Sequence, residues 1–79
     1  MFIQVIARRI YYDMPPEVEC CYVINADKIT EATPKASDAV IVSTDYGEIY
    51  EVKASWHEFK ALVGANWISK SSGRNTNEN

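Results

Sequence analysis

The sequence predicts an α+β protein that is mainly β: a small, bent antiparallel sheet or open SH3-like barrel of four to five strands, with one short C-terminal helix. Three observations lead to this class. Two β-prone runs, 39–44 and 48–53, flank a short loop that contains Gly47, as in a hairpin. Residues 2–12 are rich in β-branched and aromatic side chains and show no helical periodicity. Ser55 is followed three residues later by a glutamate, which is the spacing of a helix capping box.

The first expected strand covers residues 2–12, and a proline-containing segment follows it. Pro15 and Pro16 lack backbone donors and force extended backbone on the residues before them. Residues 13–19 are therefore expected to form a stiff loop or edge segment that separates the first two strands.

The next part of the chain combines a strand with a connection of mixed character. Residues 20–25 are apolar and bounded by polar residues, which is typical of a largely buried strand. Residues 26–32 fit one helical turn and a bent continuation of the strand equally well. Residues 33–38 are expected to form a loop, because Pro34 blocks any helix that runs through it.

The hairpin over residues 39–53 is the clearest local signal. Its second arm alternates, so Tyr50 and Val52 are expected to face the core while Glu51 and Lys53 face water. Gly47 stands where the turn needs a residue with positive φ.

The helix that follows Ser55 carries one apolar stripe, and Gly64 is placed to end it with a left-handed cap. The stripe consists of Trp56, Phe59, Leu62 and Val63. Residues 65–68 are expected to add a final anchor or edge strand, which closes a single globular domain over residues 1–68. Residues 69–79 are polar and are expected to form a disordered tail.

Size and charge narrow the class of protein. A chain of 79 residues holds one core, and its 47% hydrophobic and 24% charged residues are ordinary for a globular protein. The formal net charge is -3, whereas a nucleic-acid binder needs clustered Lys and Arg. Only Arg8 and Arg9 form an adjacent basic pair, and strand geometry points them to opposite faces. Nucleic-acid binding is therefore disfavoured.

Localisation follows from hydrophobicity and cysteine use. No stretch approaches the roughly 20 apolar residues that cross a bilayer, and no signal-peptide pattern opens the chain. Cys20 and Cys21 are adjacent, so they do not easily reach disulfide geometry and are expected to be free, buried thiols. Together these features favour a cytoplasmic protein without membrane contact.

The sequence offers no recognisable catalytic chemistry. His57 is the only histidine and is expected at the surface in the first turn of the helix. Adjacent cysteines do not match the spacing of zinc knuckles, and the three glycines form no phosphate-binding loop. The carboxylates are spread along the chain with no apolar setting that marks out an acid–base pair. We expect no catalytic residue, no cofactor and no metal, hence a protein that is not an enzyme.

Aromatic residues are the most unusual feature for so small a chain. Tyr11 and Tyr12 are neighbours in the first expected strand, so one of them should point outward. Tyr46 lies in the hairpin turn, and Trp67 lies in the expected final anchor. Exposed Tyr and Trp are common at interface centres, although a small domain also leaves some aromatics uncovered. These four residues are the predicted protein-binding residues.

Residues 25–55 resemble the FlbD-like family of small bacterial proteins associated with flagellar and swarming functions. The residues that carry the resemblance, followed by a short amphipathic helix, are Asn25, Asp27, Ile29, Asp38, Val40, Ile41, Gly47, Tyr50, Val52, Lys53 and Ser55. The strand and turn pattern is also similar to LytTR-type DNA-binding domains, which would imply contact with nucleic acid. Neither resemblance supplies catalytic residues.

These observations lead to three functional hypotheses. The first is a protein-binding module, an adaptor or regulator that uses an exposed strand edge and an aromatic patch and that hides its edges in a homodimer. The second is an acidic inhibitor, encoded by a mobile element or phage, that blocks a host nucleic-acid-handling enzyme by presenting carboxylates in place of phosphates. The third is a LytTR-like nucleic-acid-binding domain.

Overall fold

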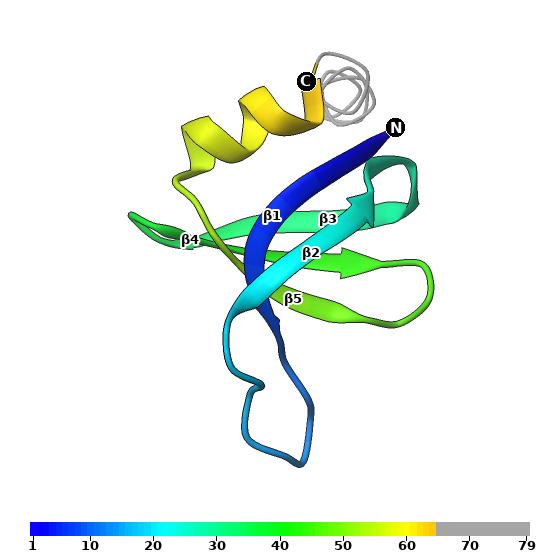
Figure 1. Cartoon of the computed structure of the whole chain (residues 1–79), viewed down its shortest axis with the longest axis vertical. Helices are drawn as coiled ribbons and strands as arrows, with labels where there is room; N and C mark the ends of the chain where they lie inside the picture. Colours follow the sequence, from blue (N-terminus) through cyan, green and yellow to red (C-terminus); the bar gives the residue numbers. More distant parts are fainter. Residues whose placement is uncertain (65–79) are drawn as a thin grey trace, which may run out of the picture.

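A computed structural model describes residues 1–64, which form one open sheet of five antiparallel strands and one short helix (Figure 1). This confirms the predicted fold class. The sheet order is β2-β1-β5-β4-β3. The elements are β1 (Phe2–Arg9), β2 (Cys20–Asn25), the 3₁₀ turn η1 (Ala26–Lys28), β3 (Ile29–Ala36), β4 (Ala39–Thr44), β5 (Ile49–Lys53) and a helix over residues 56–64.

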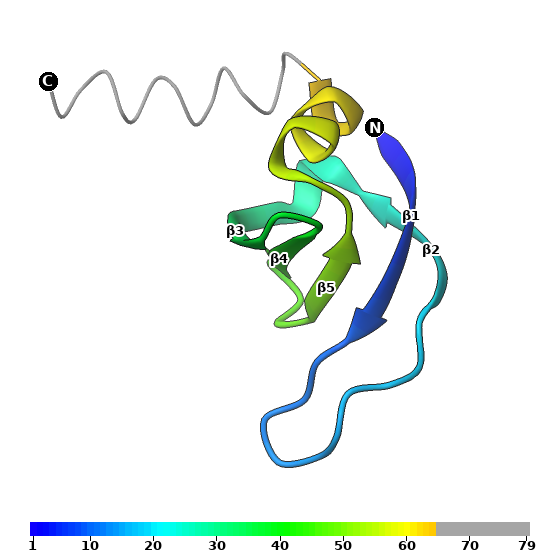
Figure 2. The same ribbon diagram turned by 90° about the vertical axis from the view of Figure 1, so that its left-hand side faces the viewer.

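Strand β1 joins the two halves of the sheet. Its residues Phe2 to Ala7 pair with β2, whereas only Ala7 to Arg9 pair with β5. The sheet bends at this change of partner, so β1 and β2 lie across β3, β4 and β5 (Figures 1 and 2). The helix covers one end of the resulting fold, and the loop between β1 and β2 extends from the other end.

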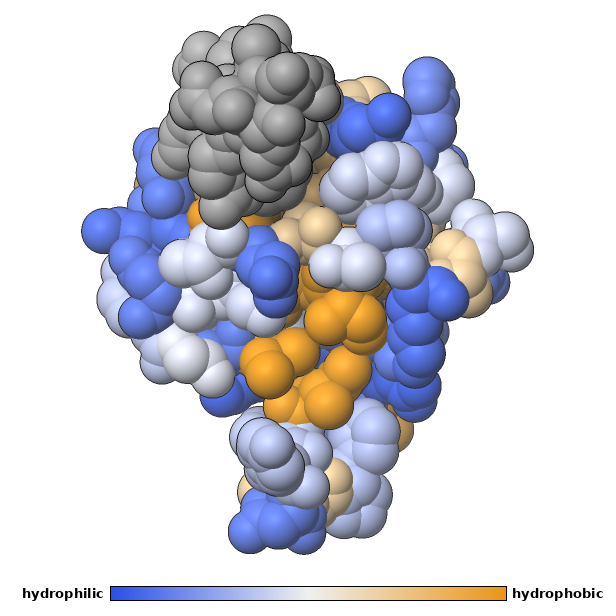
Figure 3. All heavy atoms as spheres, turned by 180° about the vertical axis from the view of Figure 1, so that it is seen from behind, coloured by the Kyte–Doolittle hydropathy of each residue, from blue (hydrophilic) through white to orange (hydrophobic). Residues whose placement is uncertain are grey.

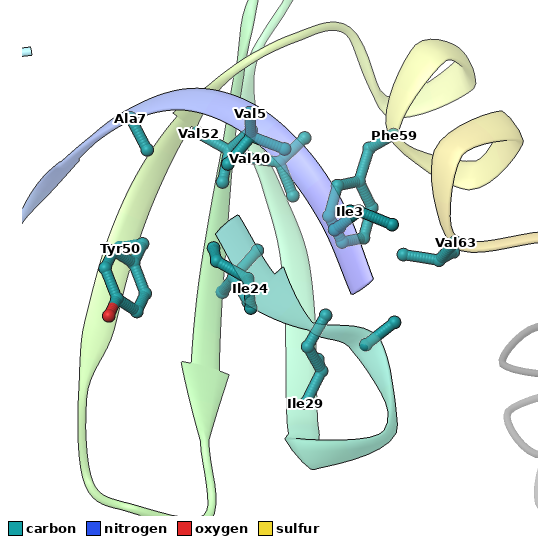
Figure 4. Close-up of a cluster of buried hydrophobic side chains, with 12 residues drawn as sticks. Ile3, Val5, Ala7, Ile24, Ile29, Val40, Tyr50, Val52, Phe59 and Val63 are labelled. Atoms are coloured by element: carbon teal, nitrogen blue, oxygen red, sulfur yellow. The ribbon is translucent and has the colours of Figure 1, made fainter. Parts of the chain in front are cut away.

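The core lies inside this bend. Alternation along β1 buries Ile3, Val5 and Ala7 and leaves Phe2 and Ile6 exposed, as expected for a strand with one core-facing side. Side chains from every strand and from the helix point toward one another in the close-up (Figure 4). The cluster consists of Ile3, Val5, Ala7, Ile24, Ala26, Ile29, Val40, Val42, Tyr50, Val52, Phe59 and Val63.

The hairpin turn, the core-facing side of β5 and the helix start agree with the sequence. Gly47 has φ +82° in the β4–β5 turn, and both predicted core residues of β5, Tyr50 and Val52, are buried. Glu51, expected to face water, keeps only 16% of its side chain exposed because Arg8 and Lys35 cover it. The capping box forms, with Ser55 N–H donating to Glu58 Oε1 at 2.8 Å and Glu58 N–H donating to Ser55 Oγ at 3.0 Å.

The predicted apolar stripe is wrong at Leu62. Phe59 and Val63 are buried and Trp56 packs against the cluster, but Leu62 keeps 42% of its surface exposed. The helix meets the core along one narrow row of residues spaced three and four apart, so a side chain beside that row lies at the border of the contact.

The predicted loop over residues 33–38 is also wrong, because β3 continues through Pro34 to Ala36. β3 is an edge strand, where proline removes no bond from the ladder if its missing N–H faces the open side. The mixed segment 26–32 contains both alternatives: η1, capped by the Asn25 side chain, and then the start of β3.

Two further predictions need correction. Other predictions concern residues that the structure does not describe. The first strand ends at Arg9 rather than at Tyr12, because residues beyond it leave the sheet for the loop. Residues 20–25 form a strand as predicted, but it is not largely buried: Cys20, Cys21 and Val23 are exposed and only Ile24 is buried, because β2 is the other edge of the sheet. The expected anchor 65–68, the domain boundary at 68 and the tail 69–79 lie outside residues 1–64.

Candidate functional site

Within residues 1–64 no strand pairs with the outer side of β2, and this free edge is the first component of the candidate site. The N–H of Ala26 donates to the Met1 carbonyl on the β1 side at 2.7 Å. Alternate residues of a strand direct their backbone groups to the same side. The N–H groups of Cys21, Val23 and Asn25 and the C=O groups of Cys21 and Val23 therefore point away from β1, along the outer edge of the sheet.

The two sheet edges differ in how they are protected. The β3 edge contains Pro34, charged side chains at Glu31 and Lys35, and register shifts in its pairing with β4. Proline, charge and bulges are the usual means of blocking strand addition. The β2 edge has none of them: its six residues include no proline or charge, and its register with β1 is regular.

A groove lies beside this edge. Its lining residues come from β2, the start of β1, η1, the end of β4, the β4–β5 turn and β5, and its volume is about 270 Å³. They are Phe2, Val23, Ile24, Asn25, Lys28, Thr44, Tyr46, Glu48 and Tyr50. Phe2, Val23 and Tyr46 are exposed by 70%, 66% and 69%, so apolar surface borders the groove on both sides. A chain that paired with β2 would pass between β2 and the β4–β5 turn.

A tyrosine–carboxylate cluster closes the Cys20 end of β2. Tyr11 and Tyr22 each donate a hydroxyl hydrogen bond to Glu17, at 2.8 and 2.9 Å. These bonds lower the pKa of Glu17 and raise the pKa values of both tyrosines. The Glu17 N–H also donates to the Arg9 carbonyl at 3.1 Å, which ties the loop to the end of β1. With the carboxylate ionised and the phenols protonated, the cluster is not set for proton transfer near pH 7.

Arg9 connects this cluster to the groove. Its guanidinium lies 5.1 Å from the Tyr11 ring centroid and 6.0 Å from that of Tyr50, and 3.7 Å from Glu48. The Tyr50 hydroxyl donates to Glu48 at 3.1 Å. Burial, followed by this bond, raises the pKa of Tyr50. These contacts connect the tyrosine–carboxylate cluster to the groove wall next to β5.

The face of the sheet that points away from the core carries ion pairs and half-buried apolar side chains. Arg8 and Lys35 both pair with Glu51, at 3.2 and 2.9 Å, and the hydrogen bond from Lys35 is the main reason that the pKa of Glu51 is lowered. Ile41 and Ile49 lie half-buried on this face. Seen from behind, apolar side chains gather in one strip between polar margins (Figure 3).

A second groove of about 360 Å³ lies between β1, the end of β5 and the helix. Ile6, Ala54 and Leu62 are among its lining residues. It lies beyond β1 from the free edge of β2, and so does not extend the site at that edge.

The structure separates the predicted site residues. Tyr46 lines the groove, Tyr11 is half-buried in the cluster, and Tyr12 is fully exposed on the β1–β2 loop. Trp67 lies outside the described residues. Sequence reasoning did not identify Glu17 or the edge of β2. Glu17 follows directly after two prolines that fix the loop, which was the available signal.

The candidate ligands for a metal lie apart. Cys21 accepts a hydrogen bond from Gln4 at 3.0 Å, and His57 is exposed on the helix. In residues 1–64, no three His, Cys, Asp or Glu side chains are grouped so that they could hold a metal ion. No helix in the same residues is long and apolar enough to span a membrane.

No protein-family model, curated protein or solved structure matches this chain.

Proposed function

We propose that this protein is a non-enzymatic protein-binding module, an adaptor or regulator that binds an extended segment of its partner as an added strand on β2. The single observation that carries the proposal is the unprotected outer edge of β2 beside the groove. In such β-augmentation, main-chain hydrogen bonds provide affinity and pockets for alternate side chains provide specificity.

The backbone supports this mode of binding. The outward N–H groups of Cys21, Val23 and Asn25 and the outward C=O groups of Cys21 and Val23 supply the donors and acceptors that an added strand needs. The Asn25 C=O is used by the first turn of η1. The Val23 side chain is 66% exposed, so the partner gains apolar contact without displacing a core residue. The equivalent edge of β3 is blocked by the features described above, which leaves one edge for the partner.

The groove supports a role for Tyr46. Its exposed ring lies across the groove from β2, where a bound segment would be covered on its second side. Tyrosine at such a position supplies a large contact area and a hydroxyl for the polar rim.

Val23→Pro tests the proposal directly. The Val23 N–H points outward, so proline removes a donor that an added strand uses while every β1–β2 bond remains. Val23→Thr keeps the N–H and the β-branched shape and is the matched control. Circular dichroism and urea unfolding establish that both variants fold.

The assay is a selection from a display library of extended peptides, followed by affinity measurement with purified chain. We expect peptides that bind the wild type and Val23→Thr, bind Val23→Pro at least about tenfold more weakly, and bind Tyr46→Ala more weakly. Binding of the selected peptides to Val23→Pro with wild-type affinity would refute strand addition. Protection of the Cys21, Val23 and Asn25 amides from hydrogen exchange in the complex would support it.

The other two hypotheses remain alternatives, and each has its own test. An acidic inhibitor requires carboxylates gathered as phosphate substitutes, but several carboxylates here are paired with cations, including Glu51 with both Arg8 and Lys35. Inhibition of a purified nucleic-acid enzyme, relieved by charge reversal, would favour it. A gel shift at low salt tests direct nucleic-acid binding.

A further inference from the structure

Resting on the proposed strand addition, we propose that the bound segment carries a basic side chain where it passes the Cys20 end of β2 and an apolar side chain where it enters the groove. The partner is thus a basic, β-prone, extended segment of another protein.

The charges around the free edge support a basic side chain in the bound segment. Glu17, Glu19, Asp45 and Glu48 flank the groove and the Cys20 end of β2. Asp45 lies 3.9 Å from Lys28, and Glu48 lies 3.7 Å from Arg9. Among the ion pairs formed by residues 1–64, none includes Glu17 or Glu19. Among residues 1–64, these four carboxylates outnumber the two cations beside them, Arg9 and Lys28, so the edge keeps an excess of negative charge, which Glu17 and Glu19 supply at the Cys20 end.

Three other cations, Arg8, Lys35 and Lys53, lie on another face of the sheet, away from Arg9 and Lys28. Arg8 and Lys35 are held by Glu51 on the outer side of β1, β3 and β5, and Lys53 is on the same side of β5. The negative surface at the free edge is therefore not offset by these cations, and a complementary segment is positive.

The groove supports an apolar side chain in the bound segment. Ile24, Tyr46 and Tyr50 supply apolar and aromatic surface to the groove, beside polar groups of Asn25, Lys28, Thr44 and Glu48. Its volume of about 270 Å³ is below the roughly 300–1,000 Å³ of small-molecule sites. It therefore suits one or two side chains of a polypeptide. Side chains of an added strand alternate between faces, so every second residue of the segment points toward the groove.

Capped, fluorescein-labelled peptides provide the test. The basic probe is Arg-Thr-Val-Thr-Val-Thr-Arg, and the matched probe has both Arg residues replaced by Glu. Binding to the full chain is followed by fluorescence anisotropy. We expect the basic probe to bind about fivefold to tenfold more tightly at low salt, as for reversal of an exposed ion pair. The preference should shrink at about 0.5 M salt, where screening is strong.

A charge reversal at the edge identifies the contact. Glu19→Lys should remove the preference for the basic probe. Glu31→Lys, at an exposed position of the β3 edge, makes the same change in net charge away from the groove and is the control. It should keep the preference. Equal effects of the two variants would show a general charge effect and overturn the assignment to the Cys20 end.

The outcomes separate this inference from the proposed function. Equal binding of both probes, with loss of both in Val23→Pro, would overturn the basic specificity while strand addition stands. Equal binding to Val23→Pro and wild type would overturn strand addition. No binding of either probe at about 1 mM would overturn the inferred specificity, since that limit excludes even a weak site. A dimer of the chain that Val23→Pro dissociates would show a second copy as the occupant.

Discussion

Replacing Phe59 by alanine tests the packing of the helix on the open sheet. The Phe59 side chain is 1% exposed and lies beside Ile3 and Val63 at the helix end of the core (Figure 4). Its ring stacks on Trp56, with centroids 5.9 Å apart and an interplanar angle of 17°. Truncating a buried phenylalanine to alanine lowers the free energy of unfolding by about 3–5 kcal/mol, because transfer free energy is lost and a cavity is left. Trp56 is only half-buried and can move into part of the space, so we expect about 3 kcal/mol.

That loss is large for a domain of this size. At about 0.05–0.15 kcal/mol per residue, 64 residues provide roughly 3–10 kcal/mol of stability. With a urea m-value near 1 kcal/mol/M, the unfolding midpoint should fall by about 3 M, measured by far-UV circular dichroism. Leu62→Ala is the control on the same helix, and its 42% exposure limits the expected loss to about 1 kcal/mol or less. Equal losses in the two variants would refute the described packing of the helix.

Three further predictions concern the loop, the turn and the cap. The hydroxyl bonds from Tyr11 and Tyr22 lower the pKa of Glu17 below its ordinary 4.5. Ionised Glu17 therefore stabilises the loop above that pH, and this stabilisation is lost as the pH falls through the lower pKa of the folded state. A ¹³C NMR titration of the Glu17 carboxyl should show this, and a midpoint at or above 4.5 would contradict it. Gly47→Ala meets no atom within 4 Å but must adopt φ +82°, so urea unfolding should show a loss of about 1–2 kcal/mol, which is smaller in Gly47→Asn. Ser55→Ala removes the capping bond and should cost about 1 kcal/mol in the same assay, whereas Ser55→Asp should retain most of it.

Local signals in the sequence were sufficient for the hairpin and the helix start. Gly47 supplies the turn conformation, and alternation around Tyr50 and Val52 sets which side of β5 is buried. Ser55 and Glu58 bond to each other three residues apart, so their effect needs no other part of the fold. Each of these features depends on neighbours in the chain.

Apart from Leu62 on the helix, the errors concern position within the sheet. Pro34 is compatible with a strand, and Cys20 is exposed, because β3 and β2 are the two edges of the sheet. Strand order depends on pairings such as Arg8 with Glu51, which are 43 residues apart and leave no local pattern. The candidate site was only partly predictable, because one part of it depends on a local turn and the other on strand order. An exposed Tyr46 follows from its turn, whereas the free edge beside it follows from the whole topology.

The change of partner along β1 also has a consequence for folding kinetics. β3, β4 and β5 follow one another as neighbouring hairpins, and β1 and β2 form another, so each unit pairs strands that are adjacent in the sequence. The short stretch from Ala7 to Arg9 alone joins the two units by strand pairing, and it must bring together distant parts of the chain. Non-local closure of this kind slows folding. Docking of the two preformed units is therefore expected to limit the rate, and substitutions at this seam should slow folding more than they speed unfolding.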